Sequence, residues 1–329
     1  MTFDEPRKHF TILRDSHADA GALKSAVVAI GNFDGVHRGH RAVIGKAILR
    51  ARALGRPAAA LTFEPHPRSY FRRHDPMFRL TDEAAKLRLL EAAGLDGCVV
   101  MTFDGRLAGL SAQDFIQEKL VRRLGVSGVV IGFDFHFGKD RQGSPAFLVA
   151  EGARLGFAVD VVGPLEDEGR PVSSSTVRAA LAAGRVVEAA ELLGYPWFVT
   201  GEVLHGDKRG RNLGFPTANI KLDPACELQH GIYAVRVGYE GRILDGVASF
   251  GQRPTFDNGA ALLEVFLFEF DGDLYGKKID VAFIGWIRPE MRFDTIEGLV
   301  ERIKDDCVRA REALARAGPV FPPIGYATR

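Results

Sequence analysis

The sequence predicts two domains of different class: an α/β domain built on a parallel sheet, then a small antiparallel β-barrel that ends in a helix. Three observations predict this. At 329 residues the chain exceeds the usual size of a single hydrophobic core. Its first half alternates apolar, strand-like runs with amphipathic helical segments. Its second half is rich in β-branched and aromatic runs separated by turn residues.

Continuous apolar runs in the first half predict strands of a parallel sheet, because such strands are buried on both faces. They span 25–30, 58–63, 98–103, 128–132 and 158–162. Helices are expected between them: one with Val43, Ile44, Ala47, Ile48 and Ala51 on one face, one opened by Thr81, one over 112–124 and one that leads up to Gly156.

After about Gly194 the pattern changes to the runs YAVRVGY, ILDGVASF, LLEVFLFEF and KIDVAFIGWI, which are typical of an antiparallel sheet or small barrel. The last helix is expected to have Asp294 as its N-cap, with Glu297 three residues later. Its expected apolar stripe is Ile296, Leu299, Val300, Ile303, Cys307 and Ala310. Pro196 favours an extended link, so we place the first domain at 1–190 and the second at 191–329.

Composition and charge exclude several classes of protein. The net charge of +1 gives no electrostatic basis for binding nucleic acid or an anionic membrane. The three cysteines are far apart and form no recognisable disulfide or zinc pattern. The N-terminus MTFDEPRKHF lacks the apolar core of a signal peptide, and no apolar run approaches the ~20 residues that span a bilayer. We therefore expect a soluble, cytoplasmic protein, and no protein partner is implied.

The segment AIGNFDGVHRGH places His37 and His40 after an expected strand and at the start of an expected helix. Ligands of open α/β sheets bind at the carboxyl ends of the strands, and a helix N-terminus favours phosphate. Glycines 31, 35 and 39 allow the backbone to approach a ligand closely. The alternative is that both histidines are ordinary surface residues. The segment matches neither GxxxxGK[ST] nor GxGxxG, which disfavours a P-loop or a dinucleotide-binding domain.

A run of hydroxyl residues, 173–176, precedes a further helical segment. Hydroxyls at a helix N-terminus can bind phosphate groups, and Arg178 can neutralise them. The alternative is a simple N-cap, and both roles are compatible.

A second glycine-rich segment, GEVLHGDKRGRNLGFPTANI, ends in Thr217 and Asn219. These residues are two apart, so their side-chain oxygens lie on one side of an extended segment and suit Mg²⁺ shared with phosphates. The alternative is a tight loop with an Asx turn. Glu264 alternates with Phe266 in an aromatic strand. Placing a carboxylate among aromatic side chains costs free energy unless it is paired, which favours a functional role such as proton abstraction. An outward-facing glutamate is the alternative there.

GNFDGVHRGH resembles the HxGH signature of the nucleotidyltransferase superfamily, and LTFEPHP, GFDFHFGKDRQG and SSSTVR are similar to segments of bacterial FAD synthetase. The resemblance implies a Rossmann-like transferase domain with His37 and His40 as catalytic residues. It implies that ATP is bound by Gly31, Asn32, Phe33, His37, His40, Ser174, Ser175 and Arg178, and the flavin by Phe63, Pro65, Pro67 and Asp134. Ser175 replaces a usual threonine, and His136 stands where arginine is common.

GRNLGFPTAN, RPTF, DLYG, RPEMRF and the strand of Glu264 resemble riboflavin kinase. The resemblance implies that Thr217 and Asn219 bind Mg²⁺–ATP and that Glu264 is the base acting on the ribityl 5′-hydroxyl. The implied ATP site comprises Gly206, Gly210, Arg211, Gly214, Thr217 and Asn219. Phe266 stands where histidine is common, and Ser249 where asparagine is common.

Together these segments identify the chain as a member of the bacterial bifunctional riboflavin kinase/FAD synthetase family. The family implies phosphorylation of riboflavin by Mg–ATP to FMN, then transfer of AMP from a second ATP to FMN, which gives FAD and pyrophosphate. Riboflavin, FMN and ATP are the expected partners, with Mg²⁺ as cofactor. The alternatives are a chain with only one working activity, another HxGH-type adenylyltransferase of a phosphorylated cofactor precursor, or a flavin carrier without turnover.

Overall fold

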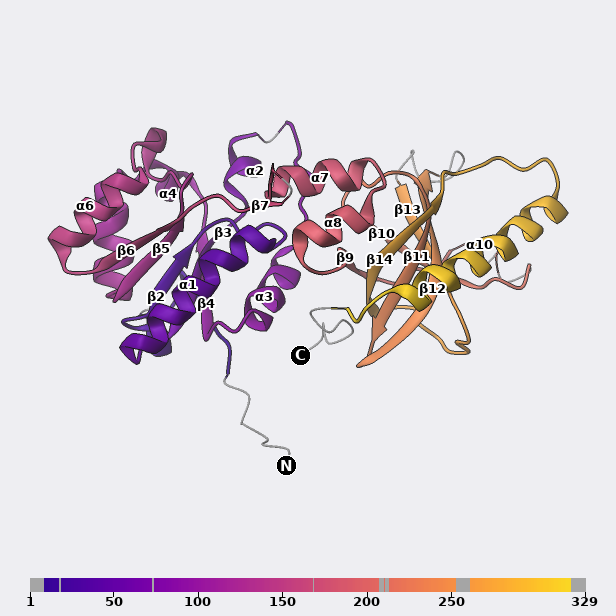
Figure 1. The fold of residues 1–329 in the computed structure, drawn as a ribbon, viewed down its shortest axis with the longest axis horizontal. Helices are drawn as coiled ribbons and strands as arrows, with labels where there is room; N and C mark the ends of the chain where they lie inside the picture. The colour runs from indigo at the N-terminus through magenta and orange to yellow at the C-terminus, as the bar shows by residue number, and fades with distance from the viewer. Residues whose placement is uncertain are drawn as a thin grey trace, which may run out of the picture. The chain divides into compact units, whose positions relative to one another are not determined.

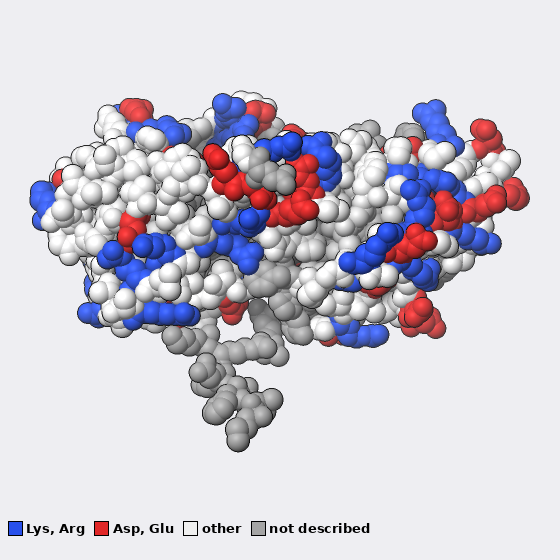
Figure 2. All heavy atoms as spheres, in the orientation of Figure 1, with Lys and Arg blue, Asp and Glu red and all other residues white. Residues whose placement is uncertain are grey.

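The computed structural model describes residues 9–17, 19–72, 74–167, 169–206, 210, 213–252 and 261–320. The chain divides into two compact units (Figure 1). The first comprises Met1–Met77 and Lys86–Val172, and the second comprises Phe78–Ala85 and Ser173–Arg329. Figure 2 shows basic and acidic side chains interspersed on the face that it draws, which fits the net charge of +1.

The first unit is built on a six-stranded sheet of order β1-β4-β3-β2-β5-β6, in which every pairing is parallel. Its strands are β1 (Thr11–Arg14), β2 (Val27–Ile30), β3 (Ala58–Glu64), β4 (Gly97–Thr102), β5 (Gly128–Gly132) and β6 (Ala158–Val162). The predicted parallel sheet is confirmed, and the edge strand β1 was not predicted. The chain runs from β2 through β3 to β4 on one side and returns to β5 on the other. The strand order therefore reverses beside β2, where open α/β sheets bind ligands.

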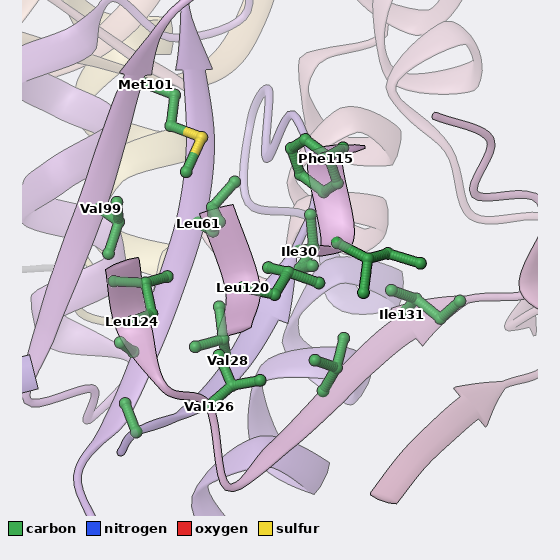
Figure 3. Close-up of a cluster of buried hydrophobic side chains, with 14 of the residues drawn as sticks. Val28, Ile30, Leu61, Val99, Met101, Phe115, Leu120, Leu124, Val126 and Ile131 are labelled. Atoms are coloured by element: carbon green, nitrogen blue, oxygen red, sulfur yellow. The ribbon is translucent and has the colours of Figure 1, made fainter. Parts of the chain in front are cut away.

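Helices cover both faces of this sheet. The helix α1 (Arg38–Leu54) packs across β2, β3 and β5, and α6 (Pro145–Leu155) packs on β6. Figure 3 shows the core on one face, where Val28, Leu61, Val99 and their strand neighbours meet Leu120 and Leu124. The shorter elements of this region are η1 (Gly21–Leu23), α2 (Pro67–Phe71), α3 (Glu83–Ala92), α4 (Gly105–Gly109), η3 (Lys139–Arg141), β7 (Glu166–Asp167) and β8 (Arg170–Pro171).

Two predicted helices differ in detail from the structure. The helix expected over 112–124 begins as α5 (Ala112–Asp114) but continues as the π-helix η2 (Phe115–Leu124), which ends at Gly125 in the left-handed conformation. The helix expected to open at Thr81 begins at Glu83, because Asp82 Oδ1 accepts a hydrogen bond from Ala85 N at 2.7 Å. A carboxylate that accepts such a bond satisfies an amide left unpaired in the first helical turn.

The second unit carries the helices α7 (Ser174–Ala182) and α8 (Val186–Leu193), followed by a six-stranded antiparallel sheet of order β10-β13-β12-β11-β14-β9. Its strands are β9 (Phe198–Glu202), β10 (Thr217–Lys221), β11 (Gly231–Tyr239), β12 (Arg242–Gln252), β13 (Ala261–Leu267) and β14 (Lys278–Arg288). Leu204 N, just beyond β9, donates to Asn219 O of β10 at 2.8 Å. This bridge joins the two edges of the sheet, so the predicted small barrel is confirmed.

The C-terminal helix α10 (Ile296–Arg316) packs on β11, β12 and β14. Its N-cap is Thr295 and not Asp294, because the Thr295 hydroxyl accepts a hydrogen bond from Gly298 N at 3.1 Å. Ile296, expected in the apolar stripe, is exposed, whereas Cys307 and Ala310 are buried as predicted. The buried pair Arg288–Asp306, with Nη2 and Oδ2 2.6 Å apart, ties the helix to the end of β14.

Candidate active sites

The turn between β2 and α1 carries the two predicted histidines of the first unit. Its backbone is unusual: Phe33, Gly35 and Val36 have φ angles of 50°, 80° and 37°, in the left-handed region. The turn is closed by a hydrogen bond from Val36 N to Phe33 O at 3.2 Å. Residues other than glycine rarely adopt positive φ angles, and those that do cluster at functional sites. The peptide chain is therefore folded back sharply at the carboxyl end of β2.

His37 and His40 lie against each other at the start of α1. His37 is the N-cap, and its Nδ1 accepts a hydrogen bond from His40 N at 3.3 Å. The two rings are stacked with centroids 3.6 Å apart, and the Phe33 ring meets His40 edge-on at 5.3 Å. A Cβ atom at Gly39 would lie 3.1 Å from both the His37 ring and Val172 O. The absence of a side chain at Gly39 therefore lets the histidine pair form.

The environment of His40 favours its neutral form. Burial lowers the pKa of His40 well below its usual value of 6.5, and the positive potentials of His37 and Lys86 lower it further. The Nδ1 atom of His40 is buried and has no hydrogen-bond partner among the described residues. A neutral imidazole still donates one N–H bond, so the residue suits electrostatic stabilisation of a phosphate.

Lys86 is a buried cation beside this turn that the sequence interpretation missed. It is 1% exposed, and its Nζ lies 2.6 Å from Glu64 Oε1. The same nitrogen contacts Thr62 Oγ1 at 3.3 Å and Asn32 O at 3.4 Å. The signal available in the sequence was a lysine within the apolar stripe of a helix that contains Leu87 and Leu90.

The residues expected to bind the flavin lie at the carboxyl ends of the two strands beside β2. Phe63 ends the buried part of β3, and Pro65 and Pro67 follow it into α2. The Phe63 ring packs edge-on against Phe103, at 6.0 Å. Asp134 lies exposed on the turn after β5. The topology therefore places these residues at the same edge of the sheet as the histidine turn.

The predicted phosphate-binding residues Ser174, Ser175 and Arg178 belong to the second unit. Ser173 is the N-cap of α7, and it forms a reciprocal capping box with Thr176. The capping function thus falls on Ser173, while Ser174 and Ser175 are the first two helical residues. Arg178 Nε donates to Phe78 O at 2.6 Å.

Three neighbouring strands align the predicted kinase residues of the second unit. Asn219 of β10 lies opposite Glu264 of β13, which in turn lies opposite Ser249 of β12. Thr217 lies two residues before Asn219, opposite Phe266. Glu264 is half-buried, and Asn219 is 6% exposed. The barrel therefore places the carboxylate next to the Thr–Asn pair.

The glycine-rich segment lies against this pair. A Cβ atom at Gly206 would collide with the side-chain amide of Asn219, and one at Gly210 would collide with Phe215 O. The Cβ position of Gly210 is also 3.7 Å from Thr217 Oγ1, and Gly214 has a left-handed φ of 87°. Arg211 lies outside the described residues, as does the RPTF segment.

Phe266 and Ser249, the two residues that differ from those common in riboflavin kinases, have distinct surroundings. The Phe266 ring packs edge-on against Phe215 at 5.3 Å, and it joins the apolar cluster that α10 covers. Since alternate residues of a strand share a face, Glu264 points to the same side of β13. Ser249 lies directly opposite Glu264.

Glu290 is a second carboxylate near Glu264, and the sequence interpretation gave it no role. Burial raises the pKa of Glu290, the charge of Glu264 raises it further, and His230 and Arg288 oppose this rise. His230 Nδ1 lies 3.8 Å from Glu290 Oε2. Two carboxylates, Glu264 and Glu290, and two basic groups, His230 and Arg288, therefore interact at this end of the barrel.

The donors of this site fit Mg²⁺. Thr217 and Asn219 offer a hydroxyl and an amide oxygen, with the Glu264 carboxylate on the next strand. Mg²⁺ takes few protein oxygens and keeps waters and substrate phosphates as its other ligands. Within the described ranges no group of three or more His, Cys, Asp or Glu side chains could hold a metal ion.

Two family models match the chain. The FAD synthetase model matches residues 19–176, and the riboflavin kinase model matches residues 193–314. Within the described residues no helix is long and apolar enough to cross a membrane.

Curated relatives match over most of their length. A bifunctional riboflavin kinase/FMN adenylyltransferase of Pseudomonas fluorescens is 42% identical over 313 residues, which cover 92% of this chain and 98% of the relative. The protein of the same name from Escherichia coli (strain K12) is 39% identical over 297 residues, covering 90% and 95%.

A solved structure matches the whole fold. The crystal structure titled as a macrolide-efflux protein from Streptococcus pneumoniae has a TM-score of 0.81 and 31% identity, and covers 93% of this chain and 99% of its own. The activity named in that title differs from the one that both family models and the curated relatives name. On the agreement of those two comparisons, the chain belongs to the bifunctional riboflavin kinase/FMN adenylyltransferase family.

Proposed function

We propose that this chain makes FAD from riboflavin in two ATP-dependent steps, each with its own set of residues. The match of bifunctional relatives along nine-tenths of the chain is the observation that carries the proposal. Both matched models lie on stretches with intact candidate residues: His37 and His40 in one, Thr217, Asn219 and Glu264 in the other.

In the first step riboflavin is phosphorylated. Glu264 accepts the proton of the ribityl 5′-hydroxyl. The hydroxyl oxygen forms a bond to the γ-phosphorus of ATP, and ADP leaves. Thr217 and Asn219 are the residues that would hold Mg²⁺, which neutralises phosphate charge when it is bound. The alignment of Asn219 with Glu264 across β10 and β13 supports this assignment. Gly206, Gly210, Arg211 and Gly214 are assigned to the phosphates by the family resemblance.

In the second step AMP is transferred. An oxygen of the FMN phosphate forms a bond to the α-phosphorus of a second ATP, and pyrophosphate leaves. His37 and His40 donate hydrogen bonds to the oxygens on which charge builds, without forming a covalent bond to substrate. The family resemblance assigns Gly31, Asn32, Phe33, Ser174, Ser175 and Arg178 to ATP, and Phe63, Pro65, Pro67 and Asp134 to the flavin.

A pair of variants separates the two steps. Asn219→Ala is expected to abolish formation of FMN from riboflavin while FMN is still converted to FAD. His40→Ala is expected to make FMN that accumulates, because it removes a donor worth about 10²–10³ in rate. Chromatography of the flavins measures both outcomes, and His17→Ala, an exposed histidine in the first unit, is the control. Equal loss of both steps in each variant would contradict the assignment of one set of residues to each step.

A further inference from the structure

The ammonium group of Lys86 lies buried where the carboxyl ends of β2 and β3 meet α3. It has three acceptors: Glu64 Oε1 at 2.6 Å, Thr62 Oγ1 at 3.3 Å and Asn32 O at 3.4 Å. A lysine has three N–H donors, so these acceptors account for all of them. Lys86 therefore acts through the protein and does not itself ligate a phosphate.

The cost of burying this charge indicates that the charge has a role. Removing an ammonium and a carboxylate from water costs several kcal/mol per ion, and apolar replacements of buried ion pairs are often neutral or stabilising. The neighbours Leu87, Leu89 and Leu90 show that this helix supplies apolar side chains to the core where packing is needed. Packing alone would be met by a leucine or methionine at residue 86.

A short chain of contacts leads from Lys86 to His40. The carbonyl of Asn32 accepts from Lys86 and also from Thr62 Oγ1, at 3.1 Å. The next residue is Phe33, whose left-handed backbone directs its ring edge-on against His40. The peptide held by Lys86 is therefore the one that immediately precedes the aromatic contact of His40.

Lys86 also acts on His40 through its charge. Titratable groups on the elements around His40 include His37 and Asp34 on the turn, Arg38 and Arg41 on α1, Glu83, Lys86 and Arg88 on α3, and Glu64 at the end of β3, whose carboxylate contacts Lys86. After burial, the charges of His37 and Lys86 lower the pKa of His40. Of these two charges, Lys86 is the one that lies outside the histidine turn.

We propose that Lys86 is a positioning residue for adenylyl transfer: it anchors the turn that carries His37 and His40, and it supplies a fixed positive charge that acts on the His40 imidazole. The proposal rests on the function assigned above to His40. It deepens that function by naming the residue that prepares the histidine for an anionic substrate.

The test compares Lys86→Met with wild type. Methionine keeps a long apolar side chain but removes the charge and all three donors. The His40 titration is followed by NMR, with the resonance assigned by its loss in His40→Gln. We expect the pKa of His40 to rise and kcat for FMN adenylylation to fall by about tenfold or more, the scale of one charged hydrogen bond lost. Riboflavin phosphorylation by the same polypeptide is expected to stay unchanged, which shows that the variant is folded.

Lys46→Met is the matched control, because Lys46 is an exposed lysine of α1 that pairs with Asp160 at 3.9 Å. It is expected to leave the His40 titration and both activities unchanged. If Lys86→Met does not fold, the uncharged pair Lys86→Gln with Glu64→Gln carries the same test, with the same rise in the pKa of His40 expected.

An unchanged His40 titration in the Lys86 variants would overturn the inference, whatever the rate. Failure of the proposed function has a different signature: His40→Ala would retain full adenylyl transfer, while the titration would still report whether Lys86 acts on His40.

Discussion

The imidazole rings of His37 and His40 lie face to face, with centroids 3.6 Å apart and planes 19° from parallel. Two cations at this separation repel strongly in a partly buried site, and the adjacent helix N-terminus also disfavours positive charge. His40 therefore favours its neutral form. A neutral imidazole can donate a hydrogen bond to a phosphate oxygen without first losing a bound counterion.

Stability of the protein should depend on pH through His40. Burial lowers its folded-state pKa below the ~6.5 of an unfolded chain, so between these values the unfolded state binds more protons. The free energy of unfolding therefore falls as the pH drops from about 7 toward the folded pKa, by at most ~1.4 kcal/mol per pH unit. Urea unfolding of wild type and His40→Gln, followed by circular dichroism at several pH values, measures this. An identical pH slope in both proteins would contradict it.

Glu264→Gln should slow phosphorylation of riboflavin. The amide cannot accept the hydroxyl proton, so kcat is expected to fall by about 10²–10⁴. The KM for ATP is expected to change little, because the interaction is made in the transition state. Steady-state kinetics of FMN formation measure both constants. Glu269→Gln, at an exposed glutamate five residues further on, is the control and should keep the wild-type rate.

Gly206→Ala should impair the same step through Asn219. The added methyl group would collide with the Asn219 amide, which is buried and must rotate away. Displacing a ligand-binding group by about 1 Å costs on the order of 10² in rate, so we expect that loss in FMN formation. Gly318→Ala, where a Cβ atom meets nothing within 4 Å, is the matched glycine control. Equal activity of the two variants would show that Asn219 is not constrained by Gly206.

Asp306→Ala should destabilise the second unit. It would leave Arg288 buried and without the carboxylate that its Nε and Nη2 contact, at 2.8 and 2.6 Å. Breaking a buried pair in this way costs about 3–5 kcal/mol. Tryptophan fluorescence reports on this unit, since Trp197 and Trp286 both belong to it. Asp305→Ala removes the pair between the exposed Asp305 carboxylate and the half-buried Arg302, and it should cost under about 1 kcal/mol.

The sequence by itself was enough to predict both sheets and the candidate residues. Parallel strands buried on two faces read as continuous apolar runs, as in β2 and β5, and glycines mark where α1 and α6 end. These patterns are local, so they can be recognised in the sequence without knowledge of the fold. Local signals placed helix starts only to within two residues: Thr295 caps α10 where Asp294 was expected.

The tertiary structure alone decided which distant residues meet. Lys86 reaches Asn32, 54 positions away along the chain, because α3 packs where β2 and β3 end. The charge of Glu264 raises the pKa of Glu290 because the barrel brings the end of β14 toward β13. Strand order and packing arise from burial summed over the whole core, and a periodic pattern along one segment carries no information about its neighbours in space.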